Sequence, residues 1–223
     1  MAIIFVTGID TGIGKSYATG LMARFLLCNG TSVITQKLVQ TGCEGIAEDI
    51  LTHRRLMATV TSEDDRSGAT CRYVFPFPAS PHLAAQIAGM TINPEDLDRD
   101  TAALAKRYSY VLVEGAGGLC APLTKQITQI EYAARRHYPV VLVTSPRLGS
   151  ISHTYAALDI LRRLSCELKC LIYNLYHDAR PEIVTDSRRL FMDRMANCGF
   201  RAPVIDIPPI GSVVPDIDFS CLL

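Results

Sequence analysis

The sequence of 223 residues has no excess of charge of either sign, since 22 Lys and Arg residues balance 22 Asp and Glu residues. Proteins that bind nucleic acid or an acidic membrane surface usually carry a basic excess. The composition therefore argues against nucleic acid and membrane as partners. It favours small-molecule chemistry or a protein partner.

Long apolar runs and paired cysteines are also lacking. No apolar run approaches the roughly 18 residues of a membrane span, and the apolar start at residues 1–6 lacks the basic flank of a signal peptide. Eight cysteines are scattered without a Cys-x-x-Cys pair, and Cys166 and Cys170 lack the second pair that a zinc site needs. We therefore expect a soluble, reduced, cytoplasmic protein in which several cysteines are small buried apolar side chains.

What the sequence does contain is an alternation of short apolar runs and helical patterns. The runs predict strands at 3–7, 32–37, 110–114, 140–144, 168–173 and 204–207. The helical patterns predict helices at 15–28, 45–57, 81–88, 94–107, 128–136, 150–164 and 181–197.

Continuous apolar strands of this kind are typical of a parallel sheet that is covered on both faces. The predicted fold is one α/β domain over residues 1–223. It has a doubly wound, mostly parallel sheet with helices on both faces and is of the P-loop NTPase type, with ligands at the carboxyl ends of the strands. The stretch 58–78, polar and then rich in proline, is predicted to be a long excursion or lid.

The most informative segment is Phe-Val-Thr-Gly-Ile-Asp-Thr-Gly-Ile-Gly-Lys-Ser at residues 5–16. An apolar strand, a glycine-rich turn and Gly-Lys-Ser at a helix start can cradle a nucleotide triphosphate, because backbone N–H groups face the phosphates. Lys15 adds a positive charge and the Ser16 hydroxyl suits Mg²⁺. Five residues separate Gly8 from Gly14, one more than in the ordinary motif. A glycine-rich turn that binds nothing is the alternative.

Three charged residues lie where predicted strands end or helices begin. Lys37 closes the second strand and points either into the phosphate crevice or into solvent. Asp49, early in a helix, is either a partner of the helix dipole or a metal ligand. Glu114 ends a buried strand before Gly-Ala-Gly-Gly. It holds Mg²⁺ directly or through water, or it precedes a plain tight turn.

Two further segments have the pattern of helix starts. In Ser80-Pro81-His82, Ser80 is the expected cap and Pro81 the first helical residue, which leaves His82 as a surface or site residue. Residues 148–153 follow a strand and open a long helix. Their N–H groups could bind a carboxylate or simply be capped.

Taken together, these segments resemble the dethiobiotin synthetase family, the ATP-dependent ring-closing enzymes of biotin biosynthesis. The family's first motif, Thr-Gly-Thr-Asp-Thr-x-x-Gly-Lys-Thr, has the same wide spacing before Gly-Lys. Six motifs of the family occur here in the same order, at 7–16, 37–42, 80–82, 114–118 and 148–153 and at Asn174. They cover nearly the whole chain.

The sequence departs from the family pattern at several points. Ile9 replaces a Thr of the loop, Leu38 replaces a Pro, and Ser152 replaces an Asn in the segment that binds the substrate carboxylate. The family's substrate-contacting Tyr has no clear counterpart around Thr185 or Asp186. The first two changes concern backbone geometry, and the last two concern substrate recognition.

The resemblance implies a reaction of 7,8-diaminononanoate with CO₂ and MgATP that gives dethiobiotin, ADP and phosphate. One amine captures CO₂ as a carbamate, the carbamate attacks the γ-phosphate, and the second amine closes the ring. Lys15, Lys37 and Thr11 are the implied catalytic residues. Positive charge must lie between the two anions, and no nucleophilic side chain is needed.

The resemblance also implies the ligand sets. Mg²⁺ is assigned to Ser16, Asp49 and Glu114. The substrate is assigned to Thr11, Lys37 and Thr41, and its carboxylate to Gly149, Ser150, Ile151 and Ser152 of a neighbouring subunit, which implies a homodimer. ATP is assigned to Gly12, Ile13, Gly14, Lys15, Ser16, Tyr17, Asp49, Glu114, Gly115, Ala116, Gly117, Asn174, Pro208, Pro209 and Ile210.

Other interpretations remain open. Partitioning and septum-site ATPases share the deviant loop, but they carry an extra Lys where this chain has Ile9-Asp10-Thr11. Amidotransferase-type synthetases of cobalamin biosynthesis carry a glutaminase domain for which this chain has no room. A catalytically altered homologue that kept the loop and lost the substrate pocket is the third alternative.

Overall fold

The computed structural model describes residues 1–176, 180–209, 211 and 214–223. Its strands are β1 (Ala2–Gly8), β2 (Val33–Lys37), β3 (Val39–Thr41), β4 (Tyr73–Phe75), β5 (Tyr110–Glu114), β6 (Val140–Thr144), β7 (Leu168–Asn174) and β8 (Val204–Ile207). Its helices are α1 (Lys15–Cys28), α2 (Glu48–Leu56), α3 (Glu63–Arg66), α4 (Pro81–Ile87), α5 (Pro94–Ala105), α6 (Gln129–Arg135), α7 (Ser150–Arg163), α8 (Pro181–Asn197) and the short 3₁₀ turn η1 (Ser220–Leu222).

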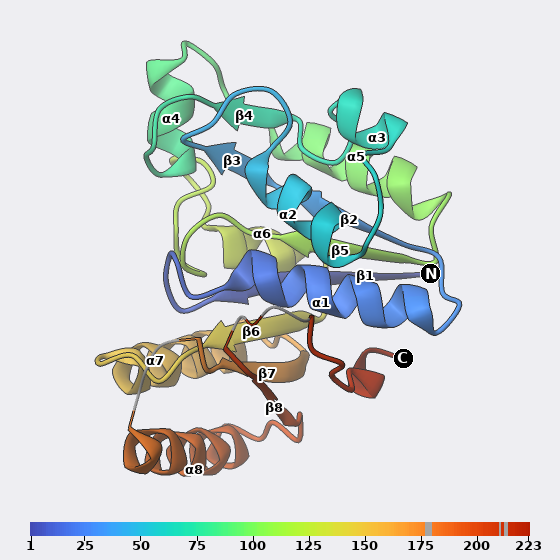
Figure 1. Ribbon diagram of the computed structural model, residues 1–223. Helices are drawn as coiled ribbons and strands as arrows, with labels where there is room; N and C mark the ends of the chain where they lie inside the picture. The colour runs from blue at the N-terminus through green and yellow to red at the C-terminus, as the bar shows by residue number, and fades with distance from the viewer. Residues whose placement is uncertain (177–179, 210, 212–213) are drawn as a thin grey trace.

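A six-stranded parallel sheet in the order β2-β5-β1-β6-β7-β8 forms the centre of the molecule. In Figure 1, α1 lies in front of the strands, and α5 and α6 lie behind them. Strands β5 and β6 are apolar along almost their whole length, and nearly all their residues are buried. A strand covered on both faces needs this continuous apolar pattern. The predicted doubly wound α/β fold is therefore confirmed.

The carboxyl ends of the central strands lie together at one edge of the sheet. Lys37 at the end of β2 is in register with Glu114 at the end of β5, and Val6 of β1 is in register with Glu114 from the other side. The loop between β1 and α1 follows from the same edge. The topology thus gathers three segments that are far apart in the sequence.

A second, two-stranded parallel sheet of β3 and β4 lies beside the first, with α4 next to it (Figure 1). Sequence patterns predicted neither these strands nor α3, because elements of three or four residues are too short to show a periodicity. The stretch 58–78, predicted to be an excursion, contains both α3 and β4.

Two ion pairs, of which the one between Arg54 and Asp65 is buried, anchor that stretch to the rest of the chain. Asp65 accepts two hydrogen bonds from Arg54, at 2.9 and 2.8 Å. Asp64 accepts two from Arg107, at 3.0 and 2.6 Å, and one from the Tyr108 hydroxyl at 2.9 Å. The stretch 58–78 is therefore fixed to the rest of the fold by these contacts.

Most predicted elements begin and end within a few residues of the observed ones, and local backbone geometry explains one difference. The helix predicted to begin at residue 45 begins at Glu48, because Gly45 has a left-handed φ of 74° that no α-helical residue adopts. The prediction of Ser80 as the cap of α4 and Pro81 as its first residue is confirmed. The Ser80 side chain makes no capping hydrogen bond, and its hydroxyl lies 3.1 Å from His82 Nδ1.

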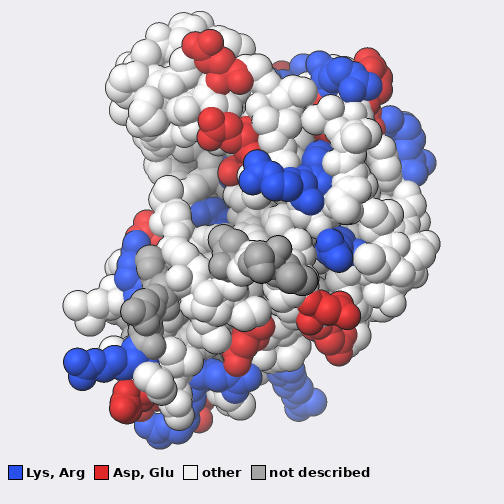
Figure 2. All heavy atoms as spheres, in the orientation of Figure 1, with Lys and Arg blue, Asp and Glu red and all other residues white. Residues whose placement is uncertain are grey.

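The cysteines behave as the composition suggests. Five are buried and all eight are free thiols. Among the described residues, no helix has the length and apolar content needed to cross a membrane. Basic and acidic side chains are interspersed on the face drawn in Figure 2.

Candidate active site at the strand ends

The loop between β1 and α1 adopts a backbone that requires glycine. Gly12 and Gly14 have left-handed φ angles of 69° and 89°. A Cβ atom at Gly14 would lie 2.0 Å from Asn174 Nδ2, at the end of β7. That amide donates to the carbonyl of Ile13 at 2.8 Å. The loop is thus held against the neighbouring strand end.

Lys15, the first residue of α1, is almost completely buried, and its Nζ donates to the carbonyl of Asp10 at 2.8 Å. Burial, together with the positive charge of Lys37, lowers the pKa of Lys15 to about 8. Asp10 is itself held by the Thr11 N–H at 2.7 Å and by an ion pair with Arg147. The Lys15 ammonium therefore lacks a close carboxylate partner among the described residues, and it would gain most from an anion.

Glu114 is fully buried and is the centre of a hydrogen-bond network. Its Oε1 accepts from Ser16 Oγ at 2.9 Å and from Lys37 Nζ at 2.7 Å, and its Oε2 lies 2.7 Å from His53 Nε2. Burial alone would raise the pKa of Glu114. The charge of Lys37 and the hydrogen bond from His53 outweigh it, so the pKa is held well below its usual range.

Lys37 differs from Lys15 in its partners. Its Nζ contacts Asp49 Oδ2 at 2.5 Å, Glu114 Oε1 at 2.7 Å and the carbonyl of Gly115 at 2.9 Å. Burial alone would lower the pKa of Lys37, but the charges of Glu114 and Asp49 raise it above its usual value. Lys37 is therefore a permanently charged group, and the strand end does not point into solvent.

These groups surround one cavity of about 410 Å³. Its lining includes Thr11, Gly12, Gly14, Lys15, Ser16, Tyr17, Lys37, Thr41, Asp49, Glu114, Ala116, Gly117 and Asn174, all of which the sequence nominated. Val39, Gln40 and Tyr176 complete it and were not foreseen. The Tyr176 hydroxyl donates to the carbonyl of Gly12.

The other nominated residues are not among those that line this cavity. Ile13 is fully buried, and the carbonyl of Gly115 accepts from Lys37. Residues 208 and 209 and the start of α7 at 149–152 do not line the cavity. Ile210 lies outside the described residues.

His53 is the functional candidate that sequence reasoning missed. It stands four residues after Asp49 on α2, so both side chains share one face of the helix. Thr35 and Lys37 share one face of β2 in the same way, two residues apart. These two spacings were the available signal. A lone His in a helix of mixed composition does not indicate a partner 61 residues away.

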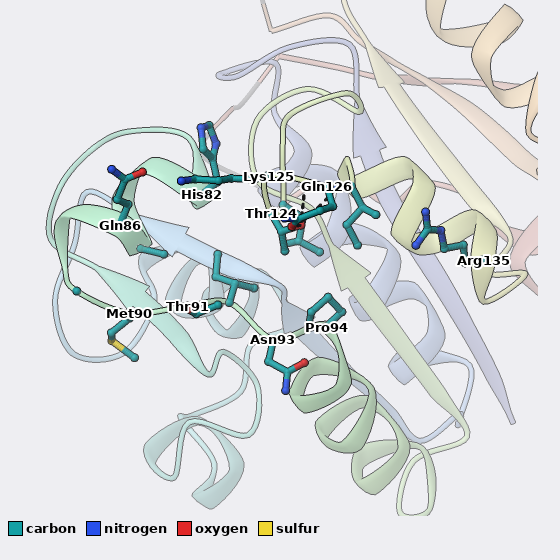
Figure 3. A pocket seen from close by; sticks show the side chains of 15 residues that line it. His82, Gln86, Met90, Thr91, Asn93, Pro94, Thr124, Lys125, Gln126 and Arg135 are labelled. Atoms are coloured by element: carbon teal, nitrogen blue, oxygen red, sulfur yellow. Dashed lines mark hydrogen bonds between the residues drawn. The ribbon is translucent and has the colours of Figure 1, made fainter.

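A second hollow, of about 900 Å³, lies beside α4 (Figure 3). Its lining includes His82 and Gln86 from α4, Lys125 from the loop before α6, and Arg135. His82, which the sequence left as a surface or site residue, therefore lies on this hollow and not on the cavity at the strand ends. None of the buried charged groups described above lines it. The smaller cavity is the better candidate for catalysis.

The oxygen atoms at the smaller cavity suit a magnesium ion. Ser16, Asp49 and Glu114 offer a hydroxyl and two carboxylates, which are hard oxygen ligands. Over the residues that the structure describes, no group of three or more His, Cys, Asp or Glu residues could hold a metal. A cation here would therefore need ligands besides carboxylates, such as the Ser16 hydroxyl and phosphate oxygens.

Comparison with known proteins agrees with this site. A family model described as an AAA domain matches residues 3–201. ATP-dependent dethiobiotin synthetase BioD 2 of Pasteurella multocida (strain Pm70) is 47% identical over 192 residues, which are 86% of this chain and 90% of the relative. ATP-dependent dethiobiotin synthetase BioD of Chlorobaculum tepidum is 44% identical over 210 residues, 94% of this chain and 88% of the relative. The chain belongs to the dethiobiotin synthetase family.

Membership in the dethiobiotin synthetase family confirms the resemblance that the six sequence motifs indicated. Solved structures support the fold alone. The MinC:MinD cell division protein complex of Aquifex aeolicus gives a TM-score of 0.56 at 19% identity, over 100% of this chain and 86% of that chain. A ParA family ATPase from Chlorobium tepidum TLS gives 0.55 at 17% identity, over 94% and 84%. These solved structures thus have the same type of fold as this chain. The sequence identity, in contrast, places the chain in the dethiobiotin synthetase family.

Proposed function

We propose that the chain catalyses the MgATP-dependent carboxylation and ring closure of 7,8-diaminononanoate with CO₂, to give dethiobiotin, ADP and phosphate in biotin biosynthesis. The observation that carries this proposal is the pair of buried ammonium groups, Lys15 and Lys37, beside a single cavity at the strand ends. Family membership supports the same reaction.

The chemistry needs two anions to approach each other, the carbamate formed on the substrate and the γ-phosphate of ATP. Lys15 and the backbone N–H groups of the loop bind the phosphates, because they offer positive charge with few competing partners. Lys37 lines the same cavity as this loop and Thr41, and there its charge offsets that of the carbamate. The hydroxyls of Thr11 and Thr41 orient the diamine. Catalysis is then positioning and electrostatics, with no covalent enzyme intermediate.

Ser16, Asp49 and Glu114 are the proposed magnesium ligands. Mg²⁺ bound there would neutralise phosphate charge during transfer. The Glu114 carboxylate is ionised for this purpose, since its pKa is held low. Lys37 lies between Asp49 and Glu114 and keeps both carboxylates at the same place.

Asn174 is the proposed contact to the adenine base. Its Oδ1 is buried without a hydrogen-bond partner among the described residues, while its Nδ2 holds the loop. A buried acceptor without a donor is costly. The exocyclic amine of adenine is a donor that would satisfy it. The segment 208–210 would frame the base.

We also propose that the enzyme is a cytoplasmic homodimer formed from a single α/β domain over residues 1–223. Residues 149–152 begin α7 away from the cavity of their own chain. Leu148 beside them is completely exposed. In the proposed dimer, this helix start holds the carboxylate of the substrate bound to the neighbouring subunit.

Product analysis by mass spectrometry tests the proposal directly. The complete mixture contains the chain, 7,8-diaminononanoate, bicarbonate and MgATP, and each component is omitted in turn. We expect dethiobiotin, with matched ADP, in the complete mixture only. ATP hydrolysis that does not depend on the diamine, with no dethiobiotin, would contradict the proposal and favour a nucleotide switch.

A further inference from the structure

His53 contacts the proposed magnesium ligand Glu114 from within the buried interior of the protein. Its side chain is fully buried, with Nε2 at 2.7 Å from Glu114 Oε2 and Nδ1 at 3.0 Å from Thr35 Oγ1. It does not line the cavity, so it cannot contact the nucleotide there. Any role of His53 in the reaction must therefore act through Glu114.

The partners of the two His53 ring nitrogens differ in what they can do. Arg54 can only donate, and its Nη1 donates to Thr35 Oγ1 at 2.9 Å. Asp65 holds that guanidinium in place from the other side. The Thr35 hydroxyl keeps a second lone pair and its own proton, so it can partner His53 Nδ1 as acceptor or as donor.

The contact with Glu114 determines which proton His53 must carry. Glu114 is ionised and can only accept, so the hydrogen bond at 2.7 Å runs from Nε2–H to Oε2. A chain of hydrogen bonds thus runs from Arg54 through Thr35 and His53 to the carboxylate. Every polar atom in this chain has a partner, as a buried network requires.

We infer that His53 is a positioning residue that holds Oε2 of Glu114 and thereby turns Oε1 toward Ser16, Lys37 and the cavity. The inference rests on the proposed function, since it concerns the role of Glu114 in binding a magnesium nucleotide. Among the described residues, His53 supplies the hydrogen bond that Oε2 receives. Without it, the carboxylate is free to rotate about its last bond and to offer Lys37 both oxygens.

A purely structural role for His53 is the competing explanation, because the residue also joins α2 to β2. Two variants separate the explanations. His53→Gln keeps an N–H donor near the position of Nε2, and His53→Leu removes it. Thr101→Val is the matched control. Thr101 is buried, and its hydroxyl lies 2.8 Å from the buried Gln36 Oε1. Gln36 lies on β2, as Thr35 does, but makes no hydrogen bond to Glu114 among those described.

The first measurement is calorimetric titration of each full-length variant with ADP, with and without Mg²⁺. The measured quantity is the ratio of the ADP affinities with and without Mg²⁺, which is the gain that Mg²⁺ provides. We expect this ratio to be about 10- to 100-fold smaller in His53→Leu than in the wild type, as loss of a group that orients a metal ligand does. His53→Gln should recover most of this gain. Thr101→Val should lower the melting temperature but keep the full gain. The inference is overturned if His53→Leu and Thr101→Val both keep it.

The second measurement needs no variant. The chain has five histidines, so ¹⁵N labelling can resolve the ring nitrogens of His53 in the wild-type protein. We expect a protonated Nε2. An unprotonated Nε2 would refute the inferred hydrogen bond to Glu114, even if His53→Leu fails to fold.

Failure of this inference is distinguishable from failure of the proposed function. If the wild-type chain forms dethiobiotin while His53→Leu binds MgADP normally, only the inference fails. If the wild-type chain forms none while the Mg²⁺-dependent affinity still requires His53, only the proposed reaction fails.

Discussion

At the scale of single residues, the site depends on two buried lysines in opposite environments. Lys37 has carboxylates on two sides, and its pKa is raised. Lys15 contacts a backbone carbonyl, and its pKa is lowered to about 8. The first is a fixed charge that orders the carboxylates around it. The second is a charge that a phosphate can satisfy, and this difference assigns the two lysines different tasks.

Lys37→Ala is expected to lower kcat by about 10²–10³-fold, as the loss of an electrostatic donor in an active site does. ATP affinity should stay mostly intact, because Lys15 and the loop remain. Steady-state kinetics of dethiobiotin formation and calorimetric ATP binding measure the two effects. Unchanged turnover would remove Lys37 from the active site.

Asn174→Ala is expected to weaken ATP binding about tenfold, the effect of one buried hydrogen bond, and to leave GTP binding less affected. Guanine presents a carbonyl where adenine presents an amine, so it does not use the free Oδ1 acceptor. The measured quantity is the ratio of the two dissociation constants. Damage to the loop, which Asn174 also holds, would weaken both nucleotides equally and leave the ratio unchanged.

At the scale of elements, α3 is held by charges rather than by an apolar stripe. Asp65 is the clearest case, since it accepts from Arg54, from the Thr70 hydroxyl at 2.8 Å and from the Ser62 N–H at 2.8 Å. Thr70 in turn accepts from the backbone N–H of Lys37 at 2.7 Å. The anchored segment is thus continuous with the strand that carries Lys37.

Asp65→Asn is expected to destabilise the protein at neutral pH by about 3–5 kcal/mol, because it leaves the buried Arg54 without a counter-charge. Burial alone would raise the pKa of Asp65. The hydrogen bonds from Arg54 and Ser62 lower it by more than burial raises it, so the pKa lies below its usual value of 3.8. Unfolded Asp65 therefore binds a proton at a higher pH than folded Asp65 does.

The pH dependence of this difference follows from its sign. The stabilisation by Asp65 is fully present above about pH 3.8 and is lost as the pH falls through the lower, folded pKa. Urea unfolding of both proteins between pH 7 and pH 3 measures it. If the difference in unfolding free energy between the wild type and Asp65→Asn already disappears between pH 7 and pH 5, this account is contradicted.

At the scale of the whole molecule, the parallel topology gathers the site. Every strand of the main sheet runs the same way, so the segments after β1, β2, β5 and β7 meet at one edge. The start of α7, in contrast, does not line that cavity. The proposed dimer accounts for both arrangements, since each subunit supplies a helix start to its partner.

Mixing two inactive variants tests this sharing. Lys37→Ala removes a charge from the cavity at the strand ends, and Ser152→Glu places a negative charge at the exposed helix start. If the sites are shared, a heterodimer contains one site with both changes and one site with neither. Equal mixing should then restore roughly a quarter of wild-type turnover, as expected for random pairing in a symmetric dimer. If turnover does not recover after subunit exchange, Lys37 and the start of α7 do not act across the dimer, and the shared site is contradicted.

The sequence by itself determined the class of fold, the loop that binds phosphate and the family. Apolar runs that lie in a parallel sheet are continuous, and glycines with left-handed angles cannot be replaced, so both leave a local signal. Lys15, Ser16, Lys37, Asp49 and Glu114 were recognisable because each lies at a strand end or a helix start.

Only the tertiary structure decided how these groups contact one another. The bond from His53 to Glu114, the placement of Lys37 between two carboxylates and the anchors of α3 join residues that are distant in sequence. No periodicity encodes such pairs, because hydrogen-bond and ion-pair partners are chosen by packing in three dimensions. The same packing buried both lysines but gave close carboxylate partners to Lys37 and not to Lys15, and this difference is why their pKa values shift in opposite directions.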